Sequence, residues 1–338
     1  MLLSGSGEPE LIIDLFCHIC PRNFLKAYVK TQVPQLLRFV EAAYAAGDAY
    51  FVDENTRLKY MDKYGIDIEV LTLSIPHIWH NIRDPIKLVT LANDAMAEIA
   101  QKNSPRLLGT ATLPVLKGEA LDELDSAISD LGLKGVQIYS NMSGDPLDSP
   151  AFLPFYEKMA KHNLPIWIHP THWEYYSWIQ DYRLIQIFGW PFDTSLAMAR
   201  LVFGGILQRY PTLKFIIHHL GGMIPYFSER ISGFYDEAIM HPHVYGAHLF
   251  PYELTKPPIE YFKMMYADTV VNGSIPALKC GFSFYGPEHV VFATDHPFGP
   301  EKGERWTREI LKSVRALEIP AEDKQKIFED NARMILKI

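Results

Sequence analysis

Side chains that bind metal ions or transfer protons stand at the ends of four predicted β-strands. The first strand ends at His18, the fifth at His169, the sixth at His218 and His219, and the eighth at Asp295. Imidazole nitrogens and carboxylate oxygens are donors that Zn²⁺ accepts, typically with three protein ligands and one place left for water or substrate. If these strand ends meet, they can form a catalytic metal site.

Such a site would combine a Lewis acid with a proton carrier. The metal would polarise a bound water or a substrate oxygen, and a neighbouring histidine would move protons. Asp295 would be either a ligand or the proton acceptor. A single histidine at a strand end is more often a structural residue, so the interpretation depends on four strands ending in this way.

The elements that must position these residues alternate between short β-branched runs and longer amphipathic stretches. Eight strands are expected, at residues 11–16, 66–73, 107–113, 136–139, 165–169, 213–218, 264–269 and 290–294. Helical spacing of apolar residues separates them, and no linker or repeat divides the chain. We therefore expect an α/β fold, a (β/α)₈ barrel forming one domain over residues 1–338, whose C-terminal strand ends carry the site. Residues 17–60 form a long first βα connection with a helical piece at 33–46, suited to cover the site.

Composition excludes several classes of protein. The 338 residues include 32 Lys+Arg and 40 Asp+Glu, giving a net charge of −8 without a basic block, so nucleic-acid binding is not expected. Three cysteines and the lack of a signal-peptide pattern favour a reducing, cytoplasmic location. Uncharged stretches stay shorter than the roughly 20 residues of a membrane span.

The sequence resembles the amidohydrolase-related metal-dependent decarboxylases and hydrolases, which include aminocarboxymuconate-semialdehyde decarboxylase and the resorcylate-type decarboxylases. The resemblance covers nearly the whole chain, in order and at matching intervals. It is carried by NDAMA at 93–97, LKGVQI at 133–138, PIWIHP at 165–170, PFDTSLA at 191–197, LVFGGI at 201–206, HLGG at 219–222, DTVV at 268–271 and ATDHPF at 293–298.

The resemblance implies an amidohydrolase-like barrel and roles for individual residues. His169 and Asp295 match metal ligands of the family, and His219 matches its acid/base histidine. His18 matches the second member of a His-x-His pair whose first member is replaced by Phe16. The implied ligands are thus His18, His169 and Asp295, holding a divalent ion, most simply Zn²⁺ with Mn²⁺ as the alternative. Phe16 would form a hydrophobic wall beside them.

Neighbouring residues are less suited to replace the missing ligand. Cys17 alternates to the opposite face of the first strand from Phe16, and Cys17 and Cys20 are interpreted as packing residues. If the sixth strand stays regular, His218 points away from His219 and is a wall residue. His296 is either a proton donor or a filler.

Residues expected to contact a substrate come mainly from the connection after the fifth strand. Its rings, including Trp173, Tyr176 and Trp190, form either packing or a wall that stacks on a planar substrate, and Arg183 is a candidate for a substrate carboxylate. Arg230 occupies the position from which decarboxylases of the family offer an arginine across a dimer interface. This implies a homodimer or a higher homo-oligomer.

Two enzyme functions share these donors. We expect a metal-dependent non-oxidative decarboxylase of an aromatic, heteroaromatic or muconate-like acid, and the aromatic connection with its arginines favours this reading. The alternative is a metal-dependent hydrolase of an amide, lactone or C–C bond. A binding protein without activity is less consistent with four polar strand ends.

Overall fold

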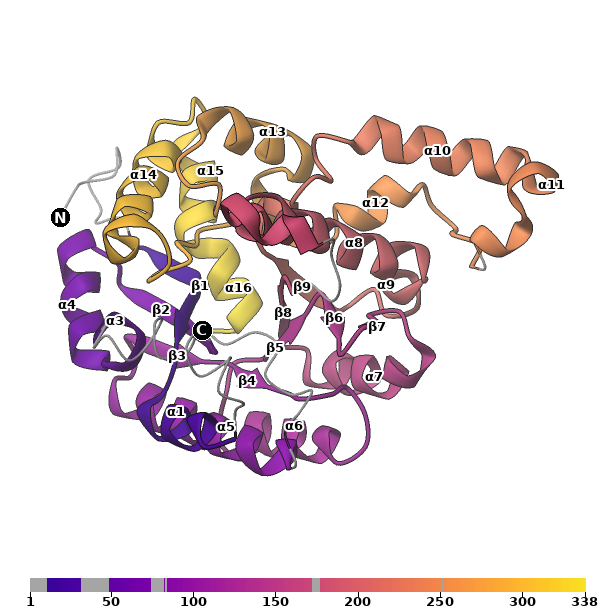
Figure 1. The fold of residues 1–338 in the computed structure, drawn as a ribbon. Coiled ribbons are helices and arrows are strands. Elements are labelled where there is room, and N and C mark those ends of the chain that lie inside the picture. The colour runs from indigo at the N-terminus through magenta and orange to yellow at the C-terminus, as the bar shows by residue number, and fades with distance from the viewer. Residues whose placement is uncertain (1–10, 32–48, 74–81, 83, 172–176, 251) are drawn as a thin grey trace.

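Eight parallel strand positions form the centre of the molecule (Figure 1). The computed structural model describes residues 11–31, 49–73, 82, 84–171, 177–250 and 252–338. The central strands are β1 (Ile13–Ile19), β2 (Ile68–Leu73), β3 (Leu107–Gly109) continued by β4 (Ala111–Thr112), β5 (Val136–Tyr139), β8 (Pro165–His169), β9 (Lys214–Ile217), β10 (Tyr266–Asp268) and β11 (Val290–Val291).

The strands close into a ring. One ladder runs β1-β2-β3, and a second runs β11-β10-β9-β8-β5-β4. The segment after β11 joins the two ends, because Leu15 N–H donates to the Phe292 carbonyl at 2.9 Å and His18 N–H donates to the His296 carbonyl at 2.7 Å. The predicted (β/α)₈ barrel is confirmed.

Helices surround this ring, and two short strands lie outside it. Asp84 accepts from Lys87 N–H and Pro85 opens the following helix, a combination that starts helices efficiently. The helices are α1 (Arg22–Val29), α3 (Ala49–Val52), α4 (Glu54–Tyr64), α5 (Pro85–Lys102), α6 (Ala120–Ser129), α7 (Leu153–His162), α8 (Trp190–Phe203), α9 (Ile206–Arg209), α10 (Ser228–Met240), α11 (Pro242–Tyr245), α12 (Pro258–Phe262), α13 (Ile275–Tyr285), α14 (Glu304–Arg315), α15 (Ala321–Gln325) and α16 (Asn331–Leu336), and the outer strands are β6 (Asn141–Met142) and β7 (Asp145–Pro146). In the described part of the chain, no helix has both the length and the apolar character required to cross a bilayer.

The core has two layers, as expected for strands that are covered on both faces. The larger layer lies between the strands and the surrounding helices. The smaller one fills the barrel, and α16 contributes Ala332, Ile335 and Leu336 to it. Within that layer the Trp167 indole donates to the Leu15 carbonyl at 2.7 Å, which ties β8 to β1 across the barrel. The barrel is therefore a packed scaffold that leaves its strand ends to carry chemistry.

The first strand is longer than predicted and irregular. It continues to Ile19, and its register against β2 shifts between Asp14 and Cys17. Such a bulge changes the direction of the residues that follow. The first connection therefore starts after Ile19 rather than at residue 17, and its predicted helical piece at 33–46 lies outside the described residues.

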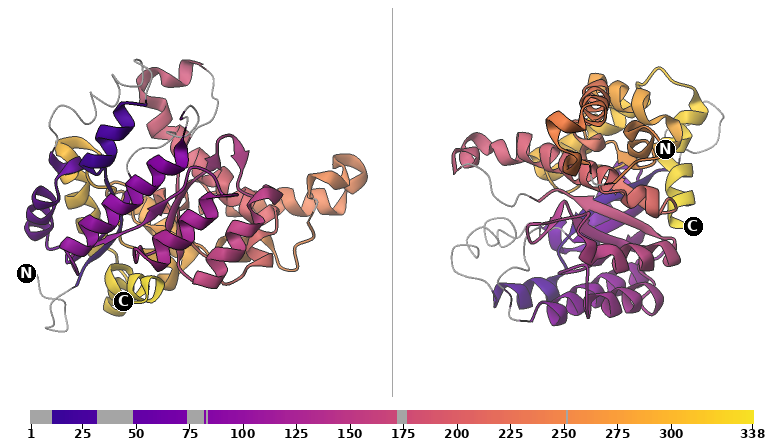
Figure 2. Two further views of the ribbon diagram at one scale, coloured as in Figure 1. Left: turned by 90° about the horizontal axis from the view of Figure 1, so that it is seen from below. Right: turned by 90° about the vertical axis from the view of Figure 1, so that its right-hand side faces the viewer.

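Helices α10 and α11 extend away from the barrel, at the right of Figure 1 and in the left view of Figure 2. None of the residues of α10 is buried. We call α10 and α11, residues 228–245, the arm. Its exposed large apolar side chains are Phe234, Ile239, Met240, Val244 and Tyr245.

Candidate active site

Three potential metal donors meet at the C-terminal ends of the strands. His18 Nε2 lies 3.0 Å from Asp295 Oδ1, and His218 Nε2 lies 3.3 Å from the same oxygen. Their donor atoms all lie within 4.8 Å of one another, and all three residues are buried. The barrel thus brings together groups from β1, from the end of β9 and from the segment after β11.

The second nitrogen of each imidazole is held by a partner. The Thr72 hydroxyl donates to the Cys17 carbonyl at 3.0 Å, so it accepts from His18 Nδ1, 2.8 Å away. Nδ1 of His218 donates to Asp268. Both Nε2 atoms are therefore directed at Asp295, as in metal sites where partners fix the histidine tautomer.

These atoms fit a divalent cation. His18 Nε2 is buried and has no hydrogen-bond partner among the residues that the structure describes. Because the His18 Nδ1–H donates to Thr72, the Nε2 lone pair faces the Asp295 carboxylate, and a cation bound between these two atoms would be coordinated by both. A metal held by His18, Asp295 and a further histidine would be such a cation.

Electrostatics keep the trio in an ion-pairing state. Burial disfavours the protonated imidazole, but Asp268 and Asp295 outweigh it and raise the pKa of His218 to about 10. Burial also opposes ionisation of Asp295, yet the charge of His218 and its hydrogen bond to the carboxylate hold the pKa of that carboxyl well below its usual range. Asp295 is therefore an anion across the physiological pH range.

His169 stands beside the trio. Its ring centroid lies 5.1 Å from that of His18 and 5.7 Å from that of His218, while Nδ1 is 2.8 Å from the Pro170 carbonyl oxygen. Burial and the neighbouring histidines lower its pKa well below the usual value, which keeps the imidazole neutral. It does not belong to the group of three donors that lie within 4.8 Å of one another.

The predicted opposition of His218 and His219 is wrong. Strand β9 ends at Ile217, and His219 and Leu220 adopt left-handed φ values of 56° and 55°. The strand therefore turns before alternation can separate the two rings, and their centroids lie 4.1 Å apart. His219 is half-buried, and its Nδ1 is a buried atom without a hydrogen-bond partner.

Phe16 is fully buried among the histidines. Its ring centroid lies 4.4 Å from His218, 5.4 Å from His18 and 6.3 Å from His169. The side chain offers no donor, so it packs as an apolar wall at the place where the family pattern has a ligand.

A family match covers most of this framework. Residues 58–338 match the family described as amidohydrolase. The chain belongs to the amidohydrolase family. The chain is also 30% identical over 286 residues to 2-amino-3-carboxymuconate-6-semialdehyde decarboxylase of Dictyostelium discoideum. The match covers 83% of this chain and 75% of the relative.

Other proteins similar to this chain are also decarboxylases. The chain is 28% identical to gamma-resorcylate decarboxylase of Rhizobium sp. (strain MTP-10005), covering 84% of this chain and 87% of the relative. The crystal structure of 5-carboxyvanillate decarboxylase from Sphingomonas paucimobilis superposes with a TM-score of 0.84 at 25% identity, covering 98% and 100% of the two chains. A 5-carboxyvanillate decarboxylase from Novosphingobium aromaticivorans has the same fold at 24% identity, TM-score 0.85 and 100% and 99% coverage, and was solved with manganese and a nitrobenzoic acid.

A buried polar network supports the site from behind, and sequence reasoning missed it. Arg57 forms an ion pair with Glu69 at 2.9 Å and donates to the backbone carbonyl of His18. The same guanidinium lies 3.2 Å from His296 Nδ1. Arg57 is on α4, where an arginine is usually exposed, so no pattern indicated it. Asp268 was within a matched segment, DTVV, and its place at the end of a strand was the available signal.

His296 packs tightly behind the site. It is fully buried, and its ring stacks on Tyr60 with centroids 3.6 Å apart and planes at 10°. The contacts with Tyr60 and Arg57 favour the alternative that His296 fills space, and its role as a substrate contact or proton donor stays a prediction.

The expected substrate contacts are only partly brought to the site. Trp190 is half-buried, with its ring centroid 6.1 Å from that of His169. Arg183 is exposed, and Arg230 is exposed on the arm with its guanidinium 4.6 Å from the Phe234 ring. Trp173 and Tyr176 lie outside the described residues.

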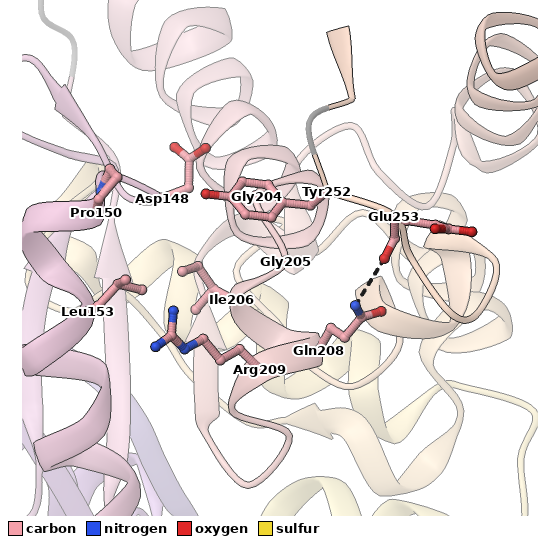
Figure 3. A pocket seen from close by; sticks show the side chains of 10 residues that line it. All are labelled: Asp148, Pro150, Leu153, Gly204, Gly205, Ile206, Gln208, Arg209, Tyr252 and Glu253. Carbon is pink, nitrogen blue, oxygen red and sulfur yellow. Dashed lines mark hydrogen bonds between the residues drawn. The ribbon is translucent and has the colours of Figure 1, made fainter. Parts of the chain in front are cut away.

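A surface pocket near α9 is separate from the candidate site (Figure 3). Its ten lining residues include Asp148, Arg209 and Tyr252, and Gln208 donates to the Glu253 carbonyl at its rim. It contains none of the histidines described above, and a pocket without such groups lacks the chemistry of the strand ends.

Acid is expected to destabilise the metal-free protein. Burial lowers the pKa of His169 and His296 well below their usual value, so the unfolded chain takes up protons first as pH falls below about 6.5. Their contribution is complete above that pH and is lost towards pH 5, by at most about 1.4 kcal/mol per pH unit for each histidine. The raised pKa of His218 acts in the opposite direction, but its contribution is constant below pH 6.5 and is lost only as pH rises towards about 10.

Urea denaturation at constant ionic strength from pH 7.5 to 5 measures this dependence. His296→Gln should make the slope shallower, because it removes one of the histidines whose pKa burial lowers. A free energy of unfolding that rises on acidification would contradict the assignment.

Proposed function

We propose that the protein is a metal-dependent non-oxidative decarboxylase of an aromatic, heteroaromatic or muconate-like carboxylic acid. The observation that carries the proposal is the convergence of His18 and Asp295 with further histidines at the mouth of a barrel whose curated relatives are decarboxylases. The names of the relatives indicate substrates that are unsaturated or aromatic carboxylic acids. The aromatic rings of Phe16 and Trp190, which lie near His169, suit such a planar group.

His18, His169 and Asp295 are proposed to hold the ion, with Zn²⁺ favoured by the nitrogen-rich donors and Mn²⁺ as the alternative that solved relatives contain. When bound, the metal would act as a Lewis acid that fixes and polarises substrate oxygens. Asp295 remains anionic and completes the charge balance.

Decarboxylation needs a proton at the carbon that loses the carboxylate. The bond between that carbon and the carboxylate breaks, CO₂ leaves, and a proton from water replaces it on the carbon, transferred by way of His219 or Asp295. His219 is well placed for this, since it is half-buried and its ring lies beside that of His218, a member of the donor trio. Phe16 keeps water from one side of the reacting region.

Release of CO₂ is the direct test of the proposal. The purified protein, dialysed without chelator and then supplied with Zn²⁺ or Mn²⁺, is assayed with hydroxybenzoates, picolinates and semialdehyde acids. We expect CO₂ from at least one class, loss of turnover after chelator treatment and its return with the metal. Turnover that is unaffected by complete metal removal would contradict a metal mechanism. Hydrolysis of amides or lactones without CO₂ release would favour the alternative, a metal-dependent hydrolase.

We also propose a homodimer that pairs through the arm. The arm exposes Phe234, Met240 and Val244 by 56%, 65% and 64%, and large apolar side chains gathered on one exposed element are typical of protein interfaces. A second copy is the proposed partner because Arg230 lies on the same arm, from which decarboxylases of the family offer an arginine to the neighbouring subunit. Closed two-fold pairs are the commonest homo-oligomers.

The double variant Met240→Glu/Val244→Glu is expected to shift the protein to monomers in sedimentation or light-scattering experiments. Met334→Glu is the matched control, because Met334 is 50% exposed on α16, away from the arm. A wild-type protein that is monomeric at assay concentrations would exclude the dimer.

A further inference from the structure

We infer that His218 is a metal ligand of this chain and replaces the donor that Phe16 has removed from the first strand. The inference rests on the proposed metal-dependent function and changes its ligand set to His18, His218 and Asp295, with His169 beside them. Three protein ligands are the usual number in a catalytic zinc site.

His218 lies beside the place of the missing donor. The rings of Phe16 and His218 are in contact, with centroids 4.4 Å apart, so the imidazole borders the space that a donor at position 16 would use. His218 Nε2 reaches Asp295 Oδ1 at 3.3 Å, close to the 3.0 Å of His18. These three side chains form the group whose donor atoms all lie within 4.8 Å of one another.

Asp268 fixes the orientation of the His218 ring. Asp268 accepts from His218 Nδ1, and its Oδ1 also accepts from the backbone N–H groups of Leu220 at 3.1 Å and Val270 at 3.0 Å. The carboxylate is thereby fixed on two sides and is fully buried. A carboxylate that holds one nitrogen of an imidazole while the other faces a metal is the usual support of a histidine ligand.

The backbone turns directly after β9. The left-handed conformation of His219 and Leu220 places consecutive histidine rings side by side, 4.1 Å apart. One strand end can then supply both a ligand, His218, and a proton carrier, His219. Alternation along β9 places Ile216 in the barrel interior and Ile217 in the outer layer, so His218 points inward like Ile216. The turn then brings His219 to the same side.

Metal affinity, measured by competition with a chelating dye, tests the inference without an activity assay. We expect wild-type protein to bind about one Zn²⁺ per chain and His218→Ala to bind it much more weakly. Asp268→Asn should weaken binding by roughly 10–100-fold, the usual effect of removing a partner that orients a ligand. His289→Gln is the control, since His289 is half-buried against Tyr266, outside this cluster.

The double variant Phe16→His/His218→Ala separates a lost ligand from a damaged fold. If His218 occupies the role of the missing donor, this variant regains affinity relative to His218→Ala, and Co²⁺-loaded protein shows a visible spectrum closer to that of wild type. His218→Ala with wild-type affinity and an unchanged Co²⁺ spectrum would overturn the inference while leaving the proposed function intact. Wild-type protein that binds no divalent ion would overturn both.

Discussion

His219→Asn is expected to lower kcat by roughly 10²–10⁴-fold, the usual cost of removing a general acid/base, while Zn²⁺ affinity stays close to that of wild type. The side chain stands next to the donor trio without belonging to it. Burial, followed by the charge of His218, lowers the pKa of His219 well below its usual value, so the imidazole is neutral before substrate binds. Asparagine keeps a polar group of similar size and removes the titratable proton.

Single-turnover kinetics on a decarboxylated substrate and dye competition for metal give the two readouts. His243→Asn is the matched control, because His243 is exposed on α11. An unchanged kcat would remove His219 from the reaction. A loss of metal that parallels the loss of rate would make His219 a ligand rather than a proton carrier.

The barrel was predictable from the sequence because its strands are buried on both faces. Strands β5 and β8 have the predicted bounds, since each is a run of residues that are all buried. Strand β11 is shorter than predicted: its ladder ends at Val291, although the following segment still bonds to β1. There Asp295, the proposed metal ligand, adopts a left-handed φ of 63°, which is incompatible with regular strand pairing at this residue.

The site was less predictable because its geometry depends on departures from regular strands. Alternation correctly separated Cys17 from Phe16 and His18: Cys17 lies in the outer layer, where its thiol donates to the Val70 carbonyl at 3.2 Å. The same rule, applied from Ile216 inside the barrel, also directs His218 inward, but it failed for His219, because the left-handed turn begins at that residue. Local turns of this kind are stabilised by tertiary contacts such as those of Asp268, which lies far along the chain.

If His218 binds the metal as inferred, the chain departs from the family pattern at Phe16 without losing a donor. Considered alone, Phe16 looks like a lost ligand and His218 like a wall residue. Their rings meet only in the folded barrel, because β1 and β9 are distant in sequence and lie on different ladders. Sequence spacing within one strand cannot reveal a pair of this type.

Arg57→Met is expected to destabilise the protein by about 3–5 kcal/mol, the usual cost of breaking a buried ion pair from one side. Arg57 and Glu69 are both fully buried, and Glu69 would keep a charge without a counterion. The variant also removes the donor to the carbonyl of His18, so metal affinity should fall with stability. Glu69, whose pKa burial already raises, would take up a proton more readily, and the loss should therefore be smaller at pH 5 than at pH 8.

Urea denaturation of the metal-free protein at both pH values measures these effects. Arg57→Met/Glu69→Leu should recover much of the loss, because replacing both members of a buried pair with apolar side chains is often neutral. Lys161→Met is the matched control: its pair with Glu157 is exposed, and exposed pairs contribute only about 0–1 kcal/mol. A loss below 1 kcal/mol for Arg57→Met would mean that water or rearrangement replaces the guanidinium. In that case the ion pair would not hold β1, and the position of His18 would depend on Thr72, the β1–β2 ladder and the backbone bond to His296.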